Sequence, residues 1–196
     1  ASYNRGLQRP DYGDFANRQS YNFVERELTA GNPFLDPLIA DQFDLSIGWY
    51  PNRNTALQAS LFYKDIQDFF VEYEGAFAFA GNPITIAPGA ASTPLEISTV
   101  LNGDSATLTG LELAYSQNFT MLPGLLSGLF VQANATLIDS EAEAPFVRPG
   151  ETFTLPGQPD YLFNLSLGWE NDVATFRLAG NWVGESLEGI SGPTTI

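Results

Sequence analysis

The chain has 196 residues, 44% of them hydrophobic and 13% aromatic, and its 8 Lys and Arg against 23 Asp and Glu give a formal net charge of −15. Such an acidic chain lacks the clustered cations that a nucleic-acid-binding surface requires. Cysteine and histidine are both absent, which excludes a disulfide framework, a thiolate metal site and a histidine-based catalytic triad. We therefore expect no enzyme, no cofactor and no metal site.

Residues 1–40 are rich in turn-forming residues, and we expect most of them to be irregular. The segment 9–14 predicts a turn, and 20–28 predicts one short strand. The segment 31–37 contains two prolines. Each proline fixes its own φ and restricts the residue before it, so this segment is expected to be a stiff loop.

The stretch 41–68 predicts two strands joined by a tight polar turn at 51–54. Apolar residues stand at every second position from Phe43 to Trp49, and again from Leu57 to Tyr63, and alternate with mostly polar residues. Successive side chains of a strand point to opposite faces. Each of these strands therefore has one apolar and one mostly polar face.

The same strand–turn–strand pattern recurs twice further along the chain. The additional strands are predicted at residues 110–119, 129–137, 161–169 and 175–182. Short turns at 120–128 and 170–172 join them in pairs, whereas 74–105 and 141–159 form long connections rich in Gly, Ala, Pro and Thr. Loops of this length usually carry function or are disordered.

The predicted strands are longer than those of most soluble proteins. At about nine to thirteen residues they exceed the usual five or six, and they reach the nine to eleven that a tilted strand needs to cross a bilayer. Aromatic residues such as Trp49, Tyr63, Trp169 and Trp182 stand near the strand ends. This combination is typical of an all-β, antiparallel, up-and-down transmembrane β-barrel, of which the chain would supply about six or seven strands.

A series of short motifs resembles the TonB-dependent outer-membrane receptors. The series consists of RPDY at 9–12, GNPFLDP at 31–37, DQFDL at 41–45, LFYKDIQDF at 61–69, TGLEL at 109–113, LPG at 155–157 and YLFNLSL at 161–167. The motifs follow the family's order over nearly the whole chain, and they match the C-terminal part of its barrel.

The resemblance implies a barrel of about 22 strands, closed by an N-terminal plug, that imports scarce nutrients across the bacterial outer membrane with energy passed on by TonB. We expect the whole chain, 1–196, to be part of this barrel. Residues 1–40 would be an extracellular loop region, 41–185 six barrel strands and 186–196 the start of the next extracellular loop. The implied partners are outer-membrane lipid, the remainder of the barrel and its plug, TonB through the plug region, and a small nutrient such as a siderophore, cobalamin or a saccharide.

Candidate substrate-binding residues come from the polar strand faces and the long loops. Arg177 would face the barrel lumen, where it could bind an anionic substrate or pair with Glu112. Four phenylalanines of the long loops could form a ligand platform or could pack the loops on each other. They are Phe77, Phe79, Phe146 and Phe153.

Two other readings of the pattern stay open at this point. A soluble β-sandwich, serving as a binding or adhesion domain, would also give each strand one apolar face. A barrel fragment could instead assemble through its open strand edges, since unpaired edges invite pairing.

Overall fold

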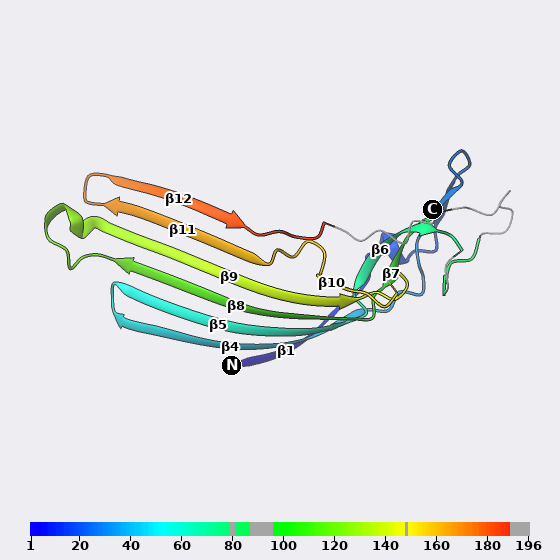
Figure 1. Cartoon of the computed structure of the whole chain (residues 1–196), viewed down its shortest axis with the longest axis horizontal. Helices are drawn as coiled ribbons and strands as arrows, with labels where there is room; N and C mark the ends of the chain where they lie inside the picture. The colour runs from blue at the N-terminus through cyan, green and yellow to red at the C-terminus, as the bar shows by residue number, and fades with distance from the viewer. Residues whose placement is uncertain (79–80, 87–95, 148, 189–196) are drawn as a thin grey trace.

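The computed structural model describes residues 1–78, 81–86, 96–147 and 149–188, and strands dominate it. The strands of its larger sheet are β1 (Ser2–Gln8), β4 (Leu38–Asn52), β5 (Thr55–Gln67), β8 (Ser105–Asn118), β9 (Leu129–Glu143), β10 (Thr152–Phe153), β11 (Tyr161–Glu170) and β12 (Thr175–Val183). Their order is β1-β4-β5-β8-β9-β11-β12, and β10 pairs with the end of β9. All neighbouring strands are antiparallel, so the chain runs up and down through one curved layer (Figure 1).

The strands of the curved layer are long, as the sequence predicts. From β4 to β12 the six strands of the meander contain between 9 and 15 residues, against about five or six in ordinary sheets. The described residues also include two short helical segments, α1 (Tyr12–Phe15) and η1 (Gly124–Gly128). No helix among the described residues is long and apolar enough to span a bilayer. The predicted all-β antiparallel fold is confirmed.

One face of the larger sheet, called here the apolar face, is covered with aliphatic and aromatic side chains. Its central row crosses five strands through successive register partners, which are Leu45, Leu61, Leu111, Leu137 and Tyr161. No second layer covers this row, because Leu45 is 57% exposed, Leu61 51% and Leu137 53%. A β-sandwich would bury these side chains between its two sheets, so the structure does not support the sandwich alternative.

The opposite face, called here the polar face, presents hydroxyl, amide and charged groups. One row pairs Ser46 with Ser60, Ser60 with Glu112 and Glu112 with Thr136. The next row toward the turns contains Gln58 and several asparagines. The alternation of apolar and mostly polar positions in the sequence therefore becomes a separation of an apolar from a mostly polar surface.

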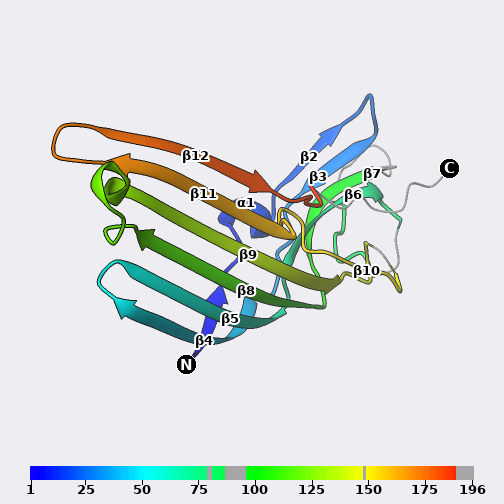
Figure 2. The ribbon, with the colours of Figure 1, turned by 60° about the vertical axis from the view of Figure 1, so that its left-hand side comes forward.

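A smaller sheet lies at the end of the molecule that carries the long connections, called here the loop end (Figure 2). Its strands are β2 (Gln19–Asn22), β3 (Glu27–Ala30), β6 (Phe70–Ala76) and β7 (Glu96–Asn102), in the order β2-β3-β7-β6. The β3–β7 pair is parallel and joins segments that are far apart in the sequence. The opposite end of the larger sheet, with its three shorter connections, is called the turn end.

The dry core of the described chain lies at the loop end and not beneath the apolar face. Its largest fully buried side chains are Tyr73, Leu28, Ile97 and Val147. They pack with small residues from the loop-end parts of the larger sheet, including Ala106 of β8. One face of the smaller sheet thus closes against the polar-face side of the larger sheet.

Where the two sheets meet, the core-facing side chains change from even-numbered to odd-numbered positions. In β5 the core-facing side chain is the even-numbered Ile66, whereas in β6 the core-facing side chains are odd-numbered, such as Val71. Asp68 lies between them with a φ of 56°, a left-handed conformation that rotates the following residues onto the other face. Across the pair, the Gly103 N–H donates to the Phe69 carbonyl at 2.7 Å.

The structure corrects three expectations about the loops. Residues 1–40 are not mostly irregular, because β1 pairs with β4 and adds a seventh strand to the six expected at 41–185. The single strand expected at 20–28 is a hairpin of β2 and β3. The long connection at 74–105 begins and ends in strands, since β6 and β7 pair along their whole length. The physical reason is tertiary pairing, because β1 pairs with β4 and β3 with β7, and these partners are distant in sequence.

Glycines on the polar face are covered by aromatic rings from the neighbouring strand. Gly110 and Phe62 are direct register partners, and a Cβ added at Gly110 would overlap the Phe62 ring. Gly168 and Phe130 repeat the arrangement between β11 and β9. Each ring occupies the space that a side chain at the glycine would need, so these glycines make room for the phenylalanines.

Replacing Gly110 with alanine should force the Phe62 ring off the sheet and lower the free energy of unfolding of the full-length protein by about 1–3 kcal/mol. Urea titration in phospholipid vesicles measures this change. Gly6 provides the matched control, because a Cβ added there meets no heavy atom within 4 Å, and Gly6→Ala should shift stability by less than about 0.5 kcal/mol. Equal effects of both substitutions would contradict the ring-over-glycine explanation.

Candidate functional site

The outer face of the smaller sheet lines a cavity of about 590 Å³, called here the loop-end pocket. One row of polar residues crosses all four strands of the sheet and lines the pocket. Ser20 of β2 pairs with Thr29, Thr29 with Ser98 of β7, and Ser98 with Glu74 of β6. Alternation within these short strands places apolar residues in the core and this polar row toward the pocket.

The loop-end pocket is negatively charged at neutral pH. Three carboxylates, Asp14, Glu72 and Glu74, line it together with a single cationic side chain, Arg18. Charges of one sign on a concave surface repel solutes of the same sign and raise the local concentration of the opposite sign. The pocket therefore suits a neutral polar or cationic molecule better than a multiply charged anion.

The GNPFLDP segment at 31–37 fixes one wall of this pocket through the buried Asn32, which is only 3% exposed. Its Nδ2 donates to the Val100 carbonyl at 3.0 Å, and its Oδ1 accepts the Phe34 N–H at 3.0 Å. Its own N–H donates to the Asp14 carbonyl at 2.6 Å. A buried amide with these partners fixes the loop to β7 and to α1.

The neighbouring Gly31 allows the close approach that this wall requires. Its N–H donates to the Arg18 carbonyl at 2.9 Å, and a Cβ in its place would overlap the carbonyl oxygen of Ala16. The structure therefore gives the first two residues of the motif a positioning role beside the pocket. Sequence reasoning identified this motif but not the pocket, whose groups on β6 and β7 fell in a segment expected to be a loop.

A second depression, of about 250 Å³, lies on the polar face of the larger sheet. Its lining includes Gln58, Ser60, Glu112 and Asn134. The Asn164 Nδ2 of the next strand donates to the Asn134 Oδ1 at 2.7 Å. This surface is uncharged apart from one carboxylate, and it offers both donors and acceptors to a polar solute.

Arg177 lies on the polar face at the turn end, distant from both depressions. Its guanidinium carbon is 5.3 Å from the centroid of the Phe130 ring, in the range of a cation–π contact. Its row continues through Gly168 and Phe130 to Asn118. Asn118 is six residues from Glu112 along β8, roughly 20 Å. The structure thus pairs Arg177 with an aromatic ring and not with Glu112, and a substrate-binding role for Arg177 stays a prediction.

The candidate phenylalanines of the long loops do not gather around the loop-end pocket. Phe77 and Phe153 are half-buried and pack against the dry core, which favours the loop-packing interpretation for both. Phe146 is 45% exposed and covers Gly81. Phe79 lies outside the described residues. None of the three described rings lines the pocket, and their part in ligand binding stays untested.

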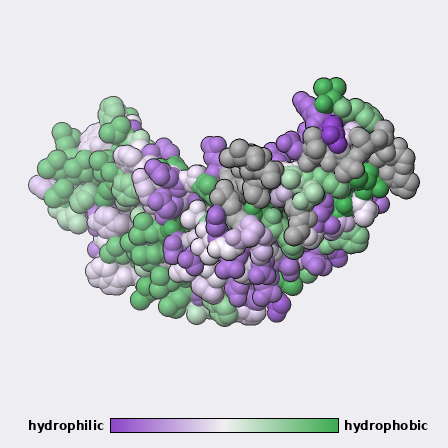
Figure 3. Space-filling model, turned by 45° about the vertical axis from the view of Figure 1, so that its right-hand side comes forward, coloured by the Kyte–Doolittle hydropathy of each residue, from purple (hydrophilic) through white to green (hydrophobic). Residues whose placement is uncertain are grey.

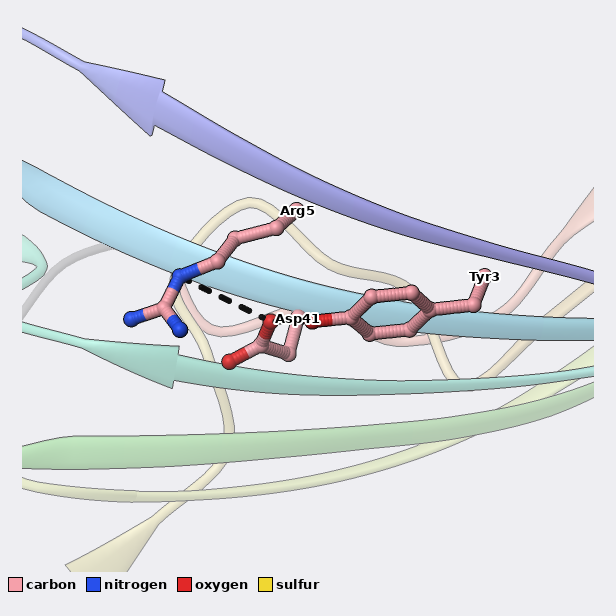
Figure 4. A network of polar contacts seen from close by, with 3 residues as sticks. All are labelled: Tyr3, Arg5 and Asp41. Atoms are coloured by element: carbon pink, nitrogen blue, oxygen red, sulfur yellow. Dashed lines mark hydrogen bonds and ion pairs between the residues drawn. The ribbon is translucent and has the colours of Figure 1, made fainter.

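Aromatic and charged residues mark where the apolar face ends toward the loops. The rings of Tyr3 and Phe43 lie 4.9 Å apart, and those of Phe43 and Tyr63 lie 6.5 Å apart. One row further, the Tyr3 hydroxyl donates to Asp41 Oδ1 at 2.6 Å, and Arg5 Nε lies 3.8 Å from the same oxygen (Figure 4). An exposed ion pair adds little stability. The Arg5–Asp41 pair matters because it marks where the apolar face ends.

A similar boundary occurs at the turn end, where the rings of Trp169 and Phe176 lie 6.0 Å apart. Between the two boundaries, β11 runs eight residues from Tyr161 to Trp169, roughly 26 Å along the strand. A barrel strand tilted by about 40° would cover about 20 Å of membrane normal over that length, most of the usual apolar band of about 25 Å.

Comparison with known proteins identifies the family of the chain. The family model described as TonB dependent receptor-like, beta-barrel matches residues 1–193, and the chain belongs to this family of transport receptors. The resemblance seen in the sequence motifs is thereby confirmed. A comparison with curated proteins gave no match.

Several solved structures share the fold. A mutant of the ferric enterobactin receptor PfeA from Pseudomonas aeruginosa, in complex with enterobactin, is 18% identical with a TM-score of 0.63, over 93% of this chain and 25% of that chain. The siderophore receptor PirA from Pseudomonas aeruginosa is 16% identical with a TM-score of 0.60, over 93% of this chain and 30% of that chain. The copper transporter OprC is 14% identical with a TM-score of 0.60, over 92% of this chain and 22% of that chain.

The chain spans between 22% and 30% of the length of these three proteins. At such low identity the likeness establishes the fold alone. It shows that the curved layer is one section of a barrel wall, in which β1 and β12 are the two edges.

Asn32→Ala should loosen the loop-end pocket, because it leaves the Val100 carbonyl and the Phe34 N–H without their buried partner at a cost of about 1–3 kcal/mol. Hydrogen exchange of the full-length receptor should show faster exchange across β3 and β7 and no change in β4 and β5. Asn22→Ala is the control, because Asn22 is the exposed last residue of β2 and its Oδ1 accepts from Val24 and Glu25 of the adjoining turn rather than from β7. Unchanged exchange in β7 for Asn32→Ala would refute the positioning role.

Proposed function

We propose that the chain forms part of the barrel wall of an outer-membrane receptor that binds a scarce nutrient and imports it with TonB-derived energy. The nutrient would be a small molecule such as a siderophore, cobalamin or a saccharide. The observation that carries this proposal is the apolar face, which is exposed across five strands. In water such a continuous apolar surface favours aggregation, whereas in a bilayer it matches the surrounding lipid.

Strand pairing supports the same conclusion. A backbone in hydrocarbon must satisfy its N–H and C=O groups internally, and only helices and closed barrels achieve this. In the described sheet each inner strand has a neighbour on both sides, while β1 and β12 each have one. In our proposal the remainder of the barrel pairs with these two edges, which removes the reason for a separate fragment to assemble through them.

In this proposal the turn end faces the periplasm and the loop end faces the outside of the cell. The loop-end pocket would then meet the nutrient first, and the neutral donors and acceptors of the polar face would line its path through the barrel. The three carboxylates against one guanidinium of the pocket favour a neutral or cationic nutrient. No chemical conversion of the nutrient is part of the mechanism.

Neighbouring residues on opposite faces of β4 test the membrane assignment. Ile47, which is 73% exposed on the apolar face, should not tolerate lysine, because a lysine facing lipid near mid-membrane costs about 2–4 kcal/mol. Ser46→Lys, one residue away on the polar face, should cost less than about 1 kcal/mol. Urea titration of the full-length receptor in phospholipid vesicles measures both. If Ile47→Lys were as harmless as Ser46→Lys, the apolar face would not contact lipid.

Dependence on TonB is tested by uptake in cells that express the full-length receptor. A panel of labelled iron chelates, cobalamin and oligosaccharides, with neutral, cationic and anionic members, identifies the imported solute. Import should fall to the level of receptor-free cells when TonB is deleted, while binding at the cell surface persists. Import that continues unchanged without TonB would contradict an energised mechanism.

A further inference from the structure

The connection between β8 and β9 differs from the other two connections at the turn end. It comprises residues 119–128, and no charged residue occurs anywhere from Leu113 to Ile138. The β4–β5 connection contains Arg53 and the β11–β12 connection contains Asp172, as expected for turns in water. The absence of charge over this length suggests that residues 119–128 lie in a less polar environment than the other two connections.

Its apolar side chains are exposed and not folded into a core. Leu125 is 76% exposed, Met121 66% and Leu126 52%. The short helix η1 that carries the two leucines has no buried residue. Three large apolar side chains on one connection form a patch that is costly in water.

Several backbone carbonyls of the connection accept hydrogen bonds from within the protein. Ser127 Oγ donates to the Gly124 carbonyl at 2.7 Å, and the Trp169 indole N–H donates to the Leu125 carbonyl at 2.5 Å. The Leu122 N–H donates to the Phe119 carbonyl at 2.9 Å. Carbonyls satisfied by side chains and by local turns lower the cost of leaving water.

The connection is also continuous with the apolar face. Trp169, whose indole contacts the connection, pairs in register with Leu129 on one side and with Phe176 on the other. Gly128 fits closely against the end of β11, since a Cβ placed there would overlap the Glu170 carbonyl oxygen and lie 3.0 Å from the indole nitrogen. Hydrophobic surface extends over the turn end of the molecule (Figure 3). Tryptophan is characteristic of the membrane–water interface.

From these observations we infer that residues 119–128 are an interfacial anchor, which lies in the boundary between headgroups and acyl chains of the phospholipid leaflet at the turn end. Leu125, Leu126 and Met121 insert into the leaflet, and Trp169 holds the backbone of the connection at the level of the headgroups. The inference rests on the proposed function, because it requires the apolar face to contact lipid. It adds that this connection binds the membrane surface, whereas the other two remain in water.

Spin labelling tests the anchor in the full-length receptor, reconstituted in vesicles of phosphatidylethanolamine and phosphatidylglycerol. The 196-residue chain contains no cysteine. A single label can therefore be placed at Leu125→Cys once any cysteines elsewhere in the receptor are replaced. Collision rates with oxygen, which concentrates in lipid, and with a nickel chelate, which stays in water, report the depth of the label. Ile47→Cys serves as the lipid reference and Arg53→Cys as the water reference. Val173→Cys is the matched control, since Val173 is an apolar residue, 91% exposed, in the β11–β12 connection.

The oxygen-to-nickel collision ratio at Leu125 should exceed the ratios at Arg53 and Val173 severalfold and approach that at Ile47. A ratio at Leu125 equal to those at Arg53 and Val173, with Ile47 still in lipid, would overturn the anchor and leave the proposed function intact. A water-like ratio at Ile47 would overturn both. Leu125→Cys lies on the surface and outside the strands, and the heat-modifiable migration of the folded barrel in gels confirms that each labelled variant is folded.

Discussion

Hydrogen bonding between neighbouring strands is the interaction on which the rest of this structure depends. The apolar face offers the backbone no polar partner, so each strand must find its partners in the strands beside it. Long antiparallel strands satisfy this requirement and also divide their side chains between two surfaces. The row from Leu45 to Tyr161 is the result on one side, and the row from Ser46 to Thr136 on the other.

In the proposed receptor, the apolar face contacts lipid, so ligand-binding groups would be confined to the polar face and to the loop end. The hydrophobic core found among the described residues lies beside the smaller sheet, where Tyr73 and Ile97 are almost fully buried. Burial raises the pKa of the Tyr73 hydroxyl, which donates to the Ala76 carbonyl and stays neutral near physiological pH. Rigid support of this kind allows a polar row of hydroxyls and carboxylates to face an open cavity with a fixed arrangement.

The sequence predicted the long strands because their alternation is strong and local. Phe43 to Trp49 and Leu57 to Tyr63 carry a large apolar residue at nearly every second position, and short turns join them. β1 escaped prediction because Arg5 stands between Tyr3 and Leu7 on what becomes one face. The partner of the Arg5 charge is Asp41 on the neighbouring strand β4, a contact that the sequence alone does not show.

The smaller sheet and the loop-end pocket could not be predicted either, because they also depend on pairing between distant segments. The parallel pairing of β3 with β7 brings Thr29 beside Ser98, and no periodicity within either segment encodes that contact. Similarly, the sequence left open whether the phenylalanines of the loops bind a ligand or pack the loops, and only the packed structure shows that Phe77 and Phe153 contact the dry core. Residues of a motif, such as Asn32, were found by resemblance, and their hydrogen bonds required coordinates.

The left-handed residue Asp68 has a consequence for how such receptors can diverge. Together with the bonds that join Gly103 to Phe69 and Asp68 to Asp104, it resets which side of the ribbon faces inward. In the proposed receptor, residues beyond this joint can therefore change their length or pattern without shifting the alternation of β5 itself. If the proposed function holds, selection for a new nutrient would remodel the β6–β7 hairpin while the strand that we propose to contact lipid keeps its spacing.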